Sequence, residues 1–487
     1  MKKVYLAIDL GAGSGRVIAG IYDGSQITLE EVNRFPNNPV NVHNGMYWSL
    51  FAFYREVLTG IKKARARWGN DIVSAGVDTW GVDYGHFSPV GELIGSPRCY
   101  RDPRTDGMVE AVRKVVSGEE IYARTGIQTM ALNTIYQLYA EKLANSATLN
   151  ASDRLLFMPD IINFFLTGQM VNERTIASTT QLYNPNTGDW DHELIAQLGL
   201  PDQIFGSIVD PGVPLGDAMI DGEPLPIVTV GAHDTASAVA AVPMEHARSA
   251  YLSSGTWSLL GQELSNPIIN EDSARENFTN EVGVDDTIRF LKNITGMWLV
   301  QECKREWDHD RETPLDFGEL AAAARESDPF VAFIDADDPS FATPGNMPQR
   351  INDYLKSHQQ PMPASHGQIV RVIYESLALK YKHTMKKMVA LTGQEVDVLH
   401  MVGGGCQNDL LNQFTANALG IPVKAGPVEA TALGNILMQM KVDGAIGTLS
   451  DGRRLVANSF ATKTFEPHDA KRWDEAYTNF IETLKLS

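Results

Sequence analysis

Short apolar runs separated by small and polar residues open the chain. The run Val4–Ile8 ends at Asp9, a glycine-rich turn follows at 11–16, and a second run covers Val17–Tyr22. Asp23 and Gly24 then precede a third run that begins at Ile27. An Asp-Gly pair between β-prone runs is a strong hairpin signal. The pattern therefore predicts that the glycine turn joins one strand to another strand, and not a strand to a helix.

Helical spacing appears next, from Leu50 to Trp68. Leu50, Phe53, Val57 and Ile61 fall on one face of this segment, and basic residues gather near its C-terminal end. A buried strand, Ile72–Val77, follows and ends at Asp78. Strand, helix and strand in this order predict a mixed α/β sheet.

A second strand–turn–strand unit is expected in the middle of the chain. Its parts are 250–252, the hydroxyl- and glycine-containing turn 253–256, and 257–261. Further on, the pattern predicts a long helix that ends near Gly393, a strand at Val398–Val402, the turn Gly403–Gly405, and a helix from about Asn408 to Leu419 closed by Gly420.

The similarity of the two strand–turn–strand units indicates two related α/β halves. We place the boundary near Val242–Met244, which predicts domains at 1–243 and 244–487. Two proline-rich stretches, 211–226 and 339–363, are expected to be long loops within these domains.

Composition narrows the choice of partners. The 487 residues are 43% hydrophobic and 21% charged, as in ordinary globular proteins. A net charge of −19 argues against nucleic-acid and anionic-membrane partners, because both favour a basic surface. Asp9 interrupts the leading apolar stretch, so we expect no export signal. The three widely spaced cysteines predict reduced thiols and a cytoplasmic protein.

Three glycine-rich turns, 11–16, 253–256 and 403–405, suggest anion binding, since glycine lets backbone amides approach a ligand. The turn at 403–405 is the strongest candidate, because a helix begins just after it. The chain has no GxxxxGK[ST] motif, and 11–16 is not GxGxxG. These differences argue against a P-loop enzyme and against a nicotinamide-dependent dehydrogenase.

Asp9 and Arg16 flank the first of these turns. Asp9 is either a turn-forming carboxylate that caps its own backbone or a ligand for a hydrated Mg²⁺ that bridges ATP phosphates; we favour the second function. Arg16 either neutralises phosphate charge or pairs with a surface carboxylate, and the sequence leaves these alternatives open.

Asp234 is the main candidate for acid–base chemistry. The segment 231–235 follows an apolar strand, 227–230, and precedes a small-residue helix at 236–241. A carboxylate at such a strand end lies where open α/β sheets bind ligands, and it can accept the proton of an attacking hydroxyl. The alternative function for Asp234 is an N-cap. We interpret the neighbouring His233 as a neutral contact to a sugar.

Polar strand ends supply further candidates. Residues 78–83 and 100–104 offer carboxylates, arginines and the indole of Trp80, groups that suit a sugar pocket but also occur as cleft-wall packing. We interpret Cys406 as a small packed residue and the acidic segment 335–338 as a solvated loop. The histidines form no HExxH or comparable spacing, so we expect no metal site made by protein ligands alone.

Several of these motifs together resemble the FGGY carbohydrate kinase family, and in particular its branch that acts on the ketose L-rhamnulose. The resemblance extends from Asp9 to about Asn435 and rests on the segments VDTWGVDYG from Val77, YRDPRT from Tyr100, NTIYQL from Asn133, MPD from Met158, ASTTQL from Ala177, GAHDT from Gly231, SSGTW from Ser253, LKNITGMWLVQE from Leu291, GGGCQN from Gly403 and AGPVEATALGN from Ala425. The Lys-Leu-x-Trp run of many family members is replaced here by residues 134–137.

This resemblance implies an α/β fold of two actin-like (ribonuclease-H-like) domains with a ligand cleft between them. It implies transfer of a phosphoryl group from ATP to the 1-hydroxyl of L-rhamnulose, which yields L-rhamnulose 1-phosphate and ADP in L-rhamnose catabolism. The alternatives are a kinase for another ketose, such as L-fuculose or L-xylulose, and an actin-like chaperone-type ATPase. A monomer or a homodimer is expected.

The resemblance also assigns residues by motif. Asp234 is implied as the proton acceptor, and Asp9 as the ligand of Mg²⁺ or another divalent cation. The remaining implied contacts are, for the nucleotide, Ala12, Gly13, Ser14, Gly15, Arg16, Thr256, Gln301 and Gly404, and, for the ketose, Gly81, His233, Asp234, Thr235 and Asn293.

Overall fold

The computed structural model describes residues 2–43, 45–244, 248–309 and 311–486, which group into two compact units. Unit 1 consists of Met1–Pro243, Glu263–Phe290 and Ala430–Ser459. Unit 2 consists of Met244–Gln262, Leu291–Glu429 and Phe460–Ser487. The first segment of unit 1 ends at Pro243, but two later segments also belong to this unit. The domain limits expected from the sequence, 1–243 and 244–487, stay a prediction.

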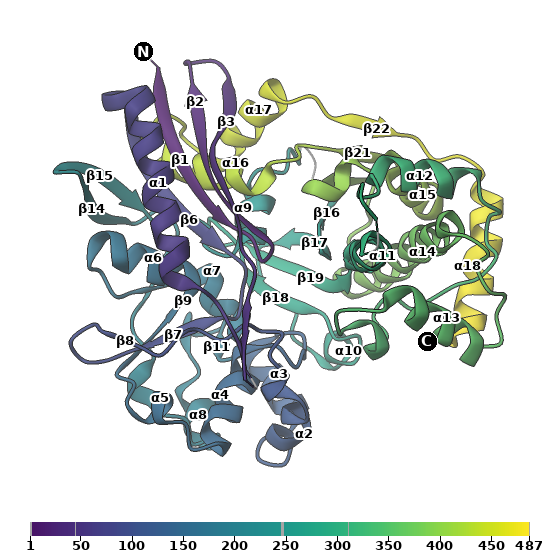
Figure 1. The fold of residues 1–487 in the computed structure, drawn as a ribbon, viewed down its shortest axis with the longest axis horizontal. Coiled ribbons are helices and arrows are strands. Elements are labelled where there is room, and N and C mark those ends of the chain that lie inside the picture. Colours follow the sequence, from purple (N-terminus) through teal and green to yellow (C-terminus); the bar gives the residue numbers. More distant parts are fainter. Residues whose placement is uncertain (1, 44, 245–247, 310, 487) are drawn as a thin grey trace. The chain divides into compact units, whose positions relative to one another are not determined.

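A six-stranded sheet forms the centre of unit 1 (Figure 1). The first three strands form an antiparallel meander, and β6 is parallel to β1. The hairpin predicted around the first glycine turn is thereby confirmed. In spatial order the strands are β14 (Pro214–Ile220), β15 (Glu223–Val228), β6 (Ile72–Thr79), β1 (Lys3–Leu10), β2 (Ser14–Tyr22) and β3 (Ile27–Pro36).

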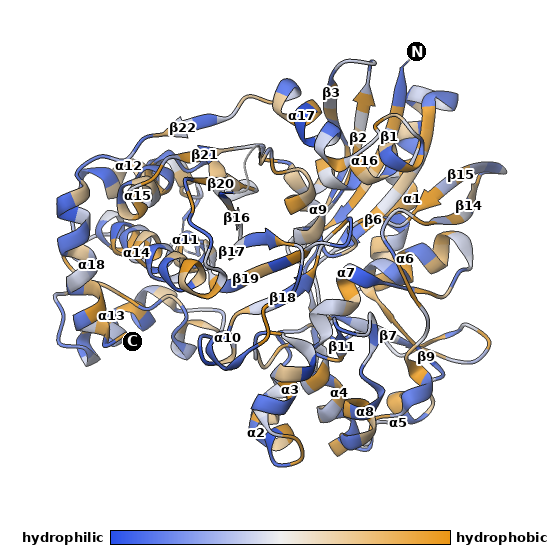
Figure 2. Ribbon diagram, turned by 180° about the vertical axis from the view of Figure 1, so that it is seen from behind, coloured by the Kyte–Doolittle hydropathy of each residue, from blue (hydrophilic) through white to orange (hydrophobic). Residues whose placement is uncertain are grey.

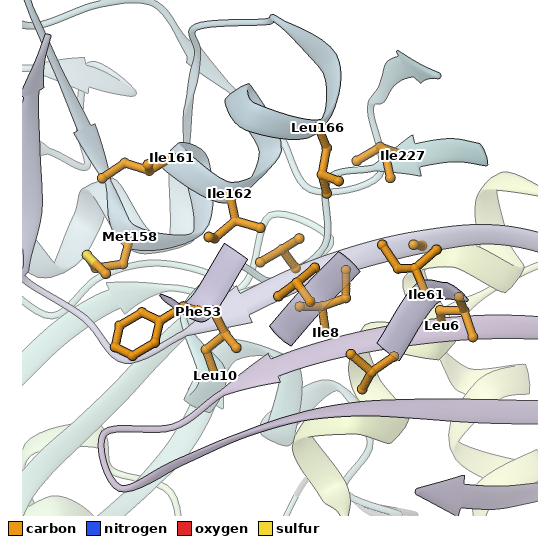
Figure 3. Packing of buried hydrophobic residues seen from close by; sticks show 14 of the residues in the cluster. Leu6, Ile8, Leu10, Phe53, Ile61, Met158, Ile161, Ile162, Leu166 and Ile227 are labelled. Atoms are coloured by element: carbon orange, nitrogen blue, oxygen red, sulfur yellow. The ribbon is translucent and has the colours of Figure 1, made fainter. Parts of the chain in front are cut away.

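Helices cover both faces of this sheet. On one face, Leu6, Ile8 and Leu10 of β1 pack with α1 (Leu50–Trp68) and α6 (Met158–Thr167), as Figure 3 shows. Because side chains alternate along a strand, the residues between these three point to the opposite face. That face is covered by α16 (Ala430–Val442), which packs on α9 (Asp234–Ala240). Asp9 belongs to this second face.

The proline-rich stretch 211–226 was expected to be a loop, and this expectation is wrong. It forms most of the antiparallel hairpin β14–β15 at the edge of the sheet. Pro224 and Pro226 pair with β14, whereas β15 contacts β6 through the register Ile227–Ala75. Proline is tolerated at such a place because its missing N–H is not needed by a second neighbouring strand.

The stretch 339–363 and the acidic segment 335–338 also differ from the expectation of loops in solvent. The first contains a 3₁₀ turn at 339–341 and the helix α13 (Met347–Ser357), which begins with proline at its second position. In the second, Asp335 and Asp337 both contact the amine of the buried Lys380, at 2.7 and 3.2 Å. A buried cation needs such partners, and this requirement holds the segment in place.

Smaller elements complete unit 1. Three short strands make a separate antiparallel sheet, and several short helices pack around it. These elements and the remaining ones of unit 1 are β4 (Val40–Val42), β5 (Gly45–Tyr47), β7 (Tyr84–Phe87), β8 (Leu93–Ile94), β9 (Arg154–Phe157), β10 (Asn172–Glu173), β11 (Tyr183–Asn184), β12 (Asp189–Trp190), β13 (Ile208–Val209), β18 (Thr279–Val282), α2 (Met108–Arg113), α3 (Gly118–Thr125), α4 (Thr134–Leu143), α5 (Ala147–Asn150), α7 (Arg174–Ala177), α8 (His192–Gln197), α10 (Glu271–Arg275) and α17 (Leu449–Ser459).

Unit 2 contains a second sheet. The strands of this sheet lie in the order β18, β19 (Ile288–Thr295), β17 (Trp257–Leu264), β16 (Ser249–Ser254), β20 (Val398–Val402), β21 (Val423–Ala425) and β22 (Lys463–Phe465), and β18 is assigned to unit 1. Chain segments at one end of β17 and of β19 belong to unit 1. The helices of unit 2 are α11 (Trp298–Asp308), α12 (Phe317–Glu326), α13, α14 (His366–Thr392), α15 (Asp409–Leu419) and α18 (Ala470–Leu484).

Most helices and strands predicted for this half are confirmed. The strand pair β16–β17, the long helix α14, the strand β20 and the helix α15 with its left-handed Gly420 cap all occur. Helix α18 alternates hydrophilic and hydrophobic colouring in Figure 2 and buries Trp473, Ala476 and Phe480 along one face.

The two sheets share one strand arrangement. In unit 1, β1 pairs with β2 in the antiparallel sense and with β6 in the parallel sense. In unit 2, β16 pairs in the same two ways with β17 and β20. The order β6-β1-β2-β3 therefore corresponds to the order β20-β16-β17-β19. This correspondence confirms the internal similarity that the two strand–turn–strand units predicted.

Candidate active site

The register of three strands brings two aspartates and one arginine together in unit 1. Asp9 pairs with Arg16 on β2 and with Asp78 on β6. The Asp9 Oδ2 to Arg16 Nη2 distance is 2.5 Å, and both side chains are largely buried. Arg16 thus pairs with a buried aspartate and not with a surface carboxylate, and neutralisation of phosphate charge by Arg16 stays a prediction. Residues 11–13 form the turn next to this pair, while Ser14, Gly15 and Arg16 begin β2, and a Cβ on the exposed Gly13 would have open space around it.

Asp78 is fully buried on the same face of the sheet. Asn435 of α16 donates a hydrogen bond from Nδ2 to Asp78 Oδ2 at 2.6 Å. Among the described residues, Oδ1 has no hydrogen-bond partner. Burial and the charge of Asp9 raise the pKa of Asp78 well above its usual range, while Asn435 opposes the shift.

Asp234 is the first residue of α9. The N-cap position is held by His233, which makes no side-chain capping bond, so the alternative that Asp234 serves as the N-cap is wrong. About a third of the Asp234 side chain, 31%, is exposed. Desolvation of the carboxyl group raises the pKa of Asp234, the neighbouring His233 lowers it, and the charge of Asp9 raises it again. The Thr235 hydroxyl donates to Asp234 Oδ1 at 3.1 Å.

The His233 ring contacts a carboxylate on one side and a buried ion pair on the other. Its Nε2 lies 3.4 Å from Asp234 Oδ1, and its Nδ1 lies 3.3 Å from Glu281 Oε2 and 3.1 Å from Arg289 Nη2. Arg289 is fully buried, and its Nη1 lies 3.1 Å from Glu281 Oε2. The imidazole is therefore held between the Asp234 carboxylate and a buried ion pair, which fixes the orientation of its ring.

The loop after β6 is held tightly as well. Gly81 lies against Thr179, and the Thr179 hydroxyl accepts a hydrogen bond from the Val82 N–H at 3.2 Å. Val82 has a positive φ of 68°, which is costly for a β-branched residue and persists only where neighbours impose it. The Thr134 hydroxyl donates to the Val82 carbonyl at 2.7 Å. Gly81, an expected ketose contact, thus sits in a preorganised turn.

Trp80 is buried and does not present an open ring face. Its indole packs on Trp48 with ring centroids 4.4 Å apart and donates to Asp83 at 2.9 Å. Asp83 also accepts hydrogen bonds from Trp48, from the Tyr100 N–H and from Gln137. This part of the VDTWGVDYG segment therefore contributes packing around a buried carboxyl group, the second of the two functions considered for Trp80.

Two of the candidate residues of unit 2, Gln301 and Gly404, line a cavity of about 980 Å³. Its lining includes Gly255, Met297, Gln301, Gly404 and an alanine-rich face of α12. A Cβ on Gly404 would meet nothing within 4 Å, whereas Gly403 has φ +82° and lies against the Ser254 carbonyl. A largely apolar cavity beside an open glycine turn suits a flat heteroaromatic group attached to phosphates.

Two further candidates belong to unit 2. The Thr256 hydroxyl donates to Gln301 Oε1 at 3.3 Å, so these two expected nucleotide contacts are neighbours. Asn293 is half-buried on β19 and is not part of that cavity's lining. The expected site residues therefore form two groups, one in each unit: Asp9, Ala12, Gly13, Ser14, Gly15, Arg16, Gly81, His233, Asp234 and Thr235 in unit 1, and Thr256, Asn293, Gln301 and Gly404 in unit 2.

The described residues contain no group of three or more histidine, cysteine, aspartate or glutamate side chains arranged to hold a metal ion. The charge balance nevertheless fits a divalent cation. Asp9, Asp78 and Asp234 influence one another electrostatically, while Arg16 is the nearby positive charge. The buried Oδ1 of Asp78, which has no hydrogen-bond partner among the described residues, is a further oxygen near Asp9. Phosphate oxygens and water would have to complete such a coordination shell.

No helix in the described parts of the chain is both long and apolar enough to span a bilayer. All three cysteines, Cys99, Cys303 and Cys406, are buried and form no disulfide. Burial raises the pKa of the Cys406 thiol to about 11, which agrees with its interpretation as a packed residue.

Comparison with known proteins identifies the class. The model of the N-terminal domain of the FGGY family of carbohydrate kinases matches residues 4–240, and the model of the C-terminal domain matches residues 250–442. The chain belongs to this family and is an ATP-dependent sugar kinase. The expected mixed α/β fold with two domains is confirmed.

Individual relatives match along nearly their whole length. The rhamnulokinase of Bacteroides thetaiotaomicron is 45% identical over 491 residues, which cover 100% of both chains. The rhamnulokinase of Enterococcus faecalis is 42% identical over 475 residues, with 96% of this chain and 94% of the relative covered. Among solved structures, the gluconate kinase of Lactobacillus acidophilus superposes with a TM-score of 0.80 at 16% identity and covers 100% of this chain and 98% of its own.

The sequence offered Asp78 as one of the carboxylates of a candidate sugar pocket, and the structure sets it opposite Asp9. Glu281 and Arg289 were not singled out, and Asn435 was noted only as the end of a family motif. No local pattern predicts the contacts of these three residues, since each lies far along the chain from the group that it contacts.

Asp83 generates a prediction about stability and pH. Burial raises the pKa of Asp83 to about 6 despite its four hydrogen bonds, from about 4 in the unfolded chain. The folded state therefore favours the protonated form, and stability is lost as the pH rises through the folded pKa. Relative to Asp83→Asn, the free energy of unfolding of the wild type should fall by about 2 kcal/mol between pH 4 and pH 7.

Denaturant unfolding of both proteins across this pH range measures the difference. Asp217→Asn, which removes an exposed carboxylate on β14, is the control for the loss of one negative charge. Parallel curves for the wild type and Asp83→Asn would show that Asp83 does not titrate in this range.

Proposed function

We propose that this sugar kinase transfers the γ-phosphoryl group of ATP to the 1-hydroxyl of L-rhamnulose, giving L-rhamnulose 1-phosphate and ADP. Similarity over the full length to proteins named rhamnulokinase supports the substrate. The single structural observation that supports the reaction is the position of Asp234. Its carboxylate is partly exposed at the start of a helix and is influenced electrostatically by Asp9.

Asp234 is the proposed proton acceptor. A strong base is not required, because in a loose phosphoryl-transfer transition state the hydroxyl proton leaves late. The Thr235 hydroxyl and the His233 imidazole lie 3.1 and 3.4 Å from Asp234 Oδ1 and restrict the orientation of the carboxylate. A positioned base of this kind contributes by aligning the nucleophile and by taking its proton.

The ketose contacts are proposed to be made by Gly81, His233, Asp234, Thr235 and Asn293. The rigid turn at Gly81 and Val82 supports this assignment, because a preorganised backbone loses little entropy when it binds a sugar hydroxyl.

The nucleotide is proposed to occupy the cavity of unit 2. Gly404, Thr256 and Gln301 are its assigned contacts there, and the turn 12–16 of unit 1 is assigned to the phosphates. The open space above Gly404 supports close approach of a ligand to the backbone.

A divalent cation, Mg²⁺ or a similar ion, is proposed to be held by Asp9 together with water and ATP phosphate oxygens. When bound, such an ion offsets negative charge on the phosphates. The excess of carboxylates over guanidinium groups around Asp9 supports this assignment. We further propose a cytoplasmic protein that acts as a monomer or homodimer, without nucleic-acid or membrane partners.

A substrate panel tests the proposed reaction. ADP release is followed in a coupled assay with L-rhamnulose, L-fuculose, L-xylulose, D-ribulose and glycerol. We expect the highest kcat/KM with L-rhamnulose, because the similarity covers the full length of proteins that bear its name. A clear preference for another compound would overturn the substrate assignment. ADP release that no sugar stimulates would instead favour the alternative ATPase.

The variant Asp234→Asn tests the proton acceptor. It keeps the shape of the side chain but cannot take a proton, so kcat should fall by about 10²- to 10⁴-fold. Steady-state kinetics with saturating ATP and ketose measure the effect. Asp217→Asn is the matched control for amide substitution at an exposed site. Turnover within a few-fold of the wild type would exclude Asp234 from this function.

Gly404→Val tests the nucleotide site. The valine side chain would project into space that is open in the folded protein, so we expect the variant to fold normally. It should bind ATP at least about tenfold more weakly, because its methyl groups would occupy the space needed by the ligand. Calorimetry with ATP measures the dissociation constant, and thermal unfolding confirms the fold. An unchanged affinity would place the nucleotide elsewhere.

A further inference from the structure

A buried carboxyl group lies directly behind the segment that carries Asp234. Glu173 precedes the short helix α7 and is fully buried. Its Oε2 accepts hydrogen bonds from the Thr175 hydroxyl at 2.6 Å, the Ile176 N–H at 3.1 Å and the Ala232 N–H at 3.3 Å. One of these three donors belongs to the backbone two residues before Asp234.

The Thr175 side chain extends this contact by one residue. Its hydroxyl donates to Glu173 and at the same time accepts a hydrogen bond from the His233 N–H at 3.1 Å. The two consecutive N–H groups before Asp234 are therefore bound by Glu173, one directly and the other through Thr175. A hydroxyl group that acts as donor and acceptor at once is fixed in orientation.

The same segment is held from its other side by the sheet. The Thr79 N–H of β6 donates to the Ala232 carbonyl at 2.8 Å, and the Ser237 hydroxyl donates to the Gly231 carbonyl at 2.6 Å. Residues 231–233 thus have little freedom to move. Asp234 follows immediately at the start of α9, so its backbone position is set by these bonds.

We propose that Glu173 and Thr175 are positioning residues for phosphoryl transfer, which hold the Asp234 carboxylate where the ketose hydroxyl can reach it. This inference rests on the proposed function of Asp234. Neither residue is assigned a contact to the ketose or the nucleotide. Both act through the backbone of 232–233.

A purely structural function for Glu173 is the alternative, since its carboxylate also caps α7 through Ile176. The two functions separate at Thr175. Loss of its hydroxyl leaves the capping bond in place but removes the partner of the His233 N–H. A capping function alone predicts lower stability and normal turnover, whereas positioning predicts lower turnover.

The test uses Thr175→Val, which has nearly the same shape and lacks the hydroxyl. We expect kcat to fall by about 10- to 100-fold, as for a small misplacement of a reacting group, with the KM for ATP within twofold of the wild type. Thr175→Ser restores the hydroxyl and should restore kcat to within about threefold. A Thr175→Val enzyme with wild-type kcat would overturn the proposal.

Thr180→Val is the matched control. Thr180 is also fully buried, and its hydroxyl also donates to one group, the Ala177 carbonyl at 2.7 Å, and accepts from another, the Leu182 N–H at 3.1 Å. We expect it to lower the melting temperature about as much as Thr175→Val but to leave kcat unchanged. If both variants lose turnover in proportion to stability, the effect is structural and the proposal is wrong.

Glu173→Gln provides a second test if Thr175→Val does not fold. At pH 8 and above, where the Glu173 carboxyl group is mostly ionised, the amide keeps one acceptor oxygen but lacks the charge that strengthens such bonds, so kcat should fall by a few-fold. An unchanged kcat in this variant would likewise overturn the proposal.

Combining the substitutions separates this inference from the proposed function. If Thr175 acts through Asp234, Thr175→Val should lower kcat by less than about twofold when Asp234 is already asparagine. An equal loss in both backgrounds would show that Thr175 acts by another route. Full activity of Asp234→Asn itself would reject the proposed function, whereas an inactive Asp234→Asn with a fully active Thr175→Val would reject the positioning inference alone.

Discussion

The parallel pairing of β1 with β6 is the constraint on which the chemistry of unit 1 depends. It sets Asp9 directly opposite Asp78 at the ends of two strands whose other face is packed with aliphatic side chains. Both carboxylates consequently face α16, which packs on α9, the helix that begins with Asp234. A shift of one residue in this register would turn one carboxylate toward the hydrophobic core.

Keeping a buried carboxylate charged costs free energy unless the group is paired or hydrogen-bonded. Unit 1 contains several such carboxylates. Arg16 and Asn435 compensate Asp9 and Asp78, two indoles and an amide surround Asp83, and hydroxyl and backbone donors surround Glu173. Burial still raises the pKa of Asp83 to about 6 and that of Glu173 to about 7. These two buried carboxyl groups order the backbone around the candidate site. Folded proteins tend to retain energetically unfavourable groups at functional sites.

Local signals in the sequence predicted the parts of the structure that local forces determine. The helix Leu50–Trp68 has the predicted limits, because its apolar spacing is complete within the segment. The glycine turns and Gly420 also lie as expected. The hairpin at 211–226 was mistaken for a loop, because the prolines suggested a chain break and the neighbouring strand that accommodates them is distant. The contacts of Arg289 and Asn435 depend on tertiary structure and carry no local pattern.

The two units share a strand order but differ in the chemistry of their turns. The β1–β2 turn lies beside an ion pair of Asp9 and Arg16, whereas the β16–β17 turn places Ser254 and Gly255 beside neutral glycines. Of these two turns, the one beside charged side chains therefore belongs to unit 1, which also contains the proposed proton acceptor Asp234. Unit 2 offers a largely apolar cavity with few ionisable groups in its lining, which suits a heteroaromatic base. A duplicated scaffold can serve a two-substrate enzyme in this way, because the sheet fixes where the turns lie while the residues of each turn determine which ligand chemistry it accommodates.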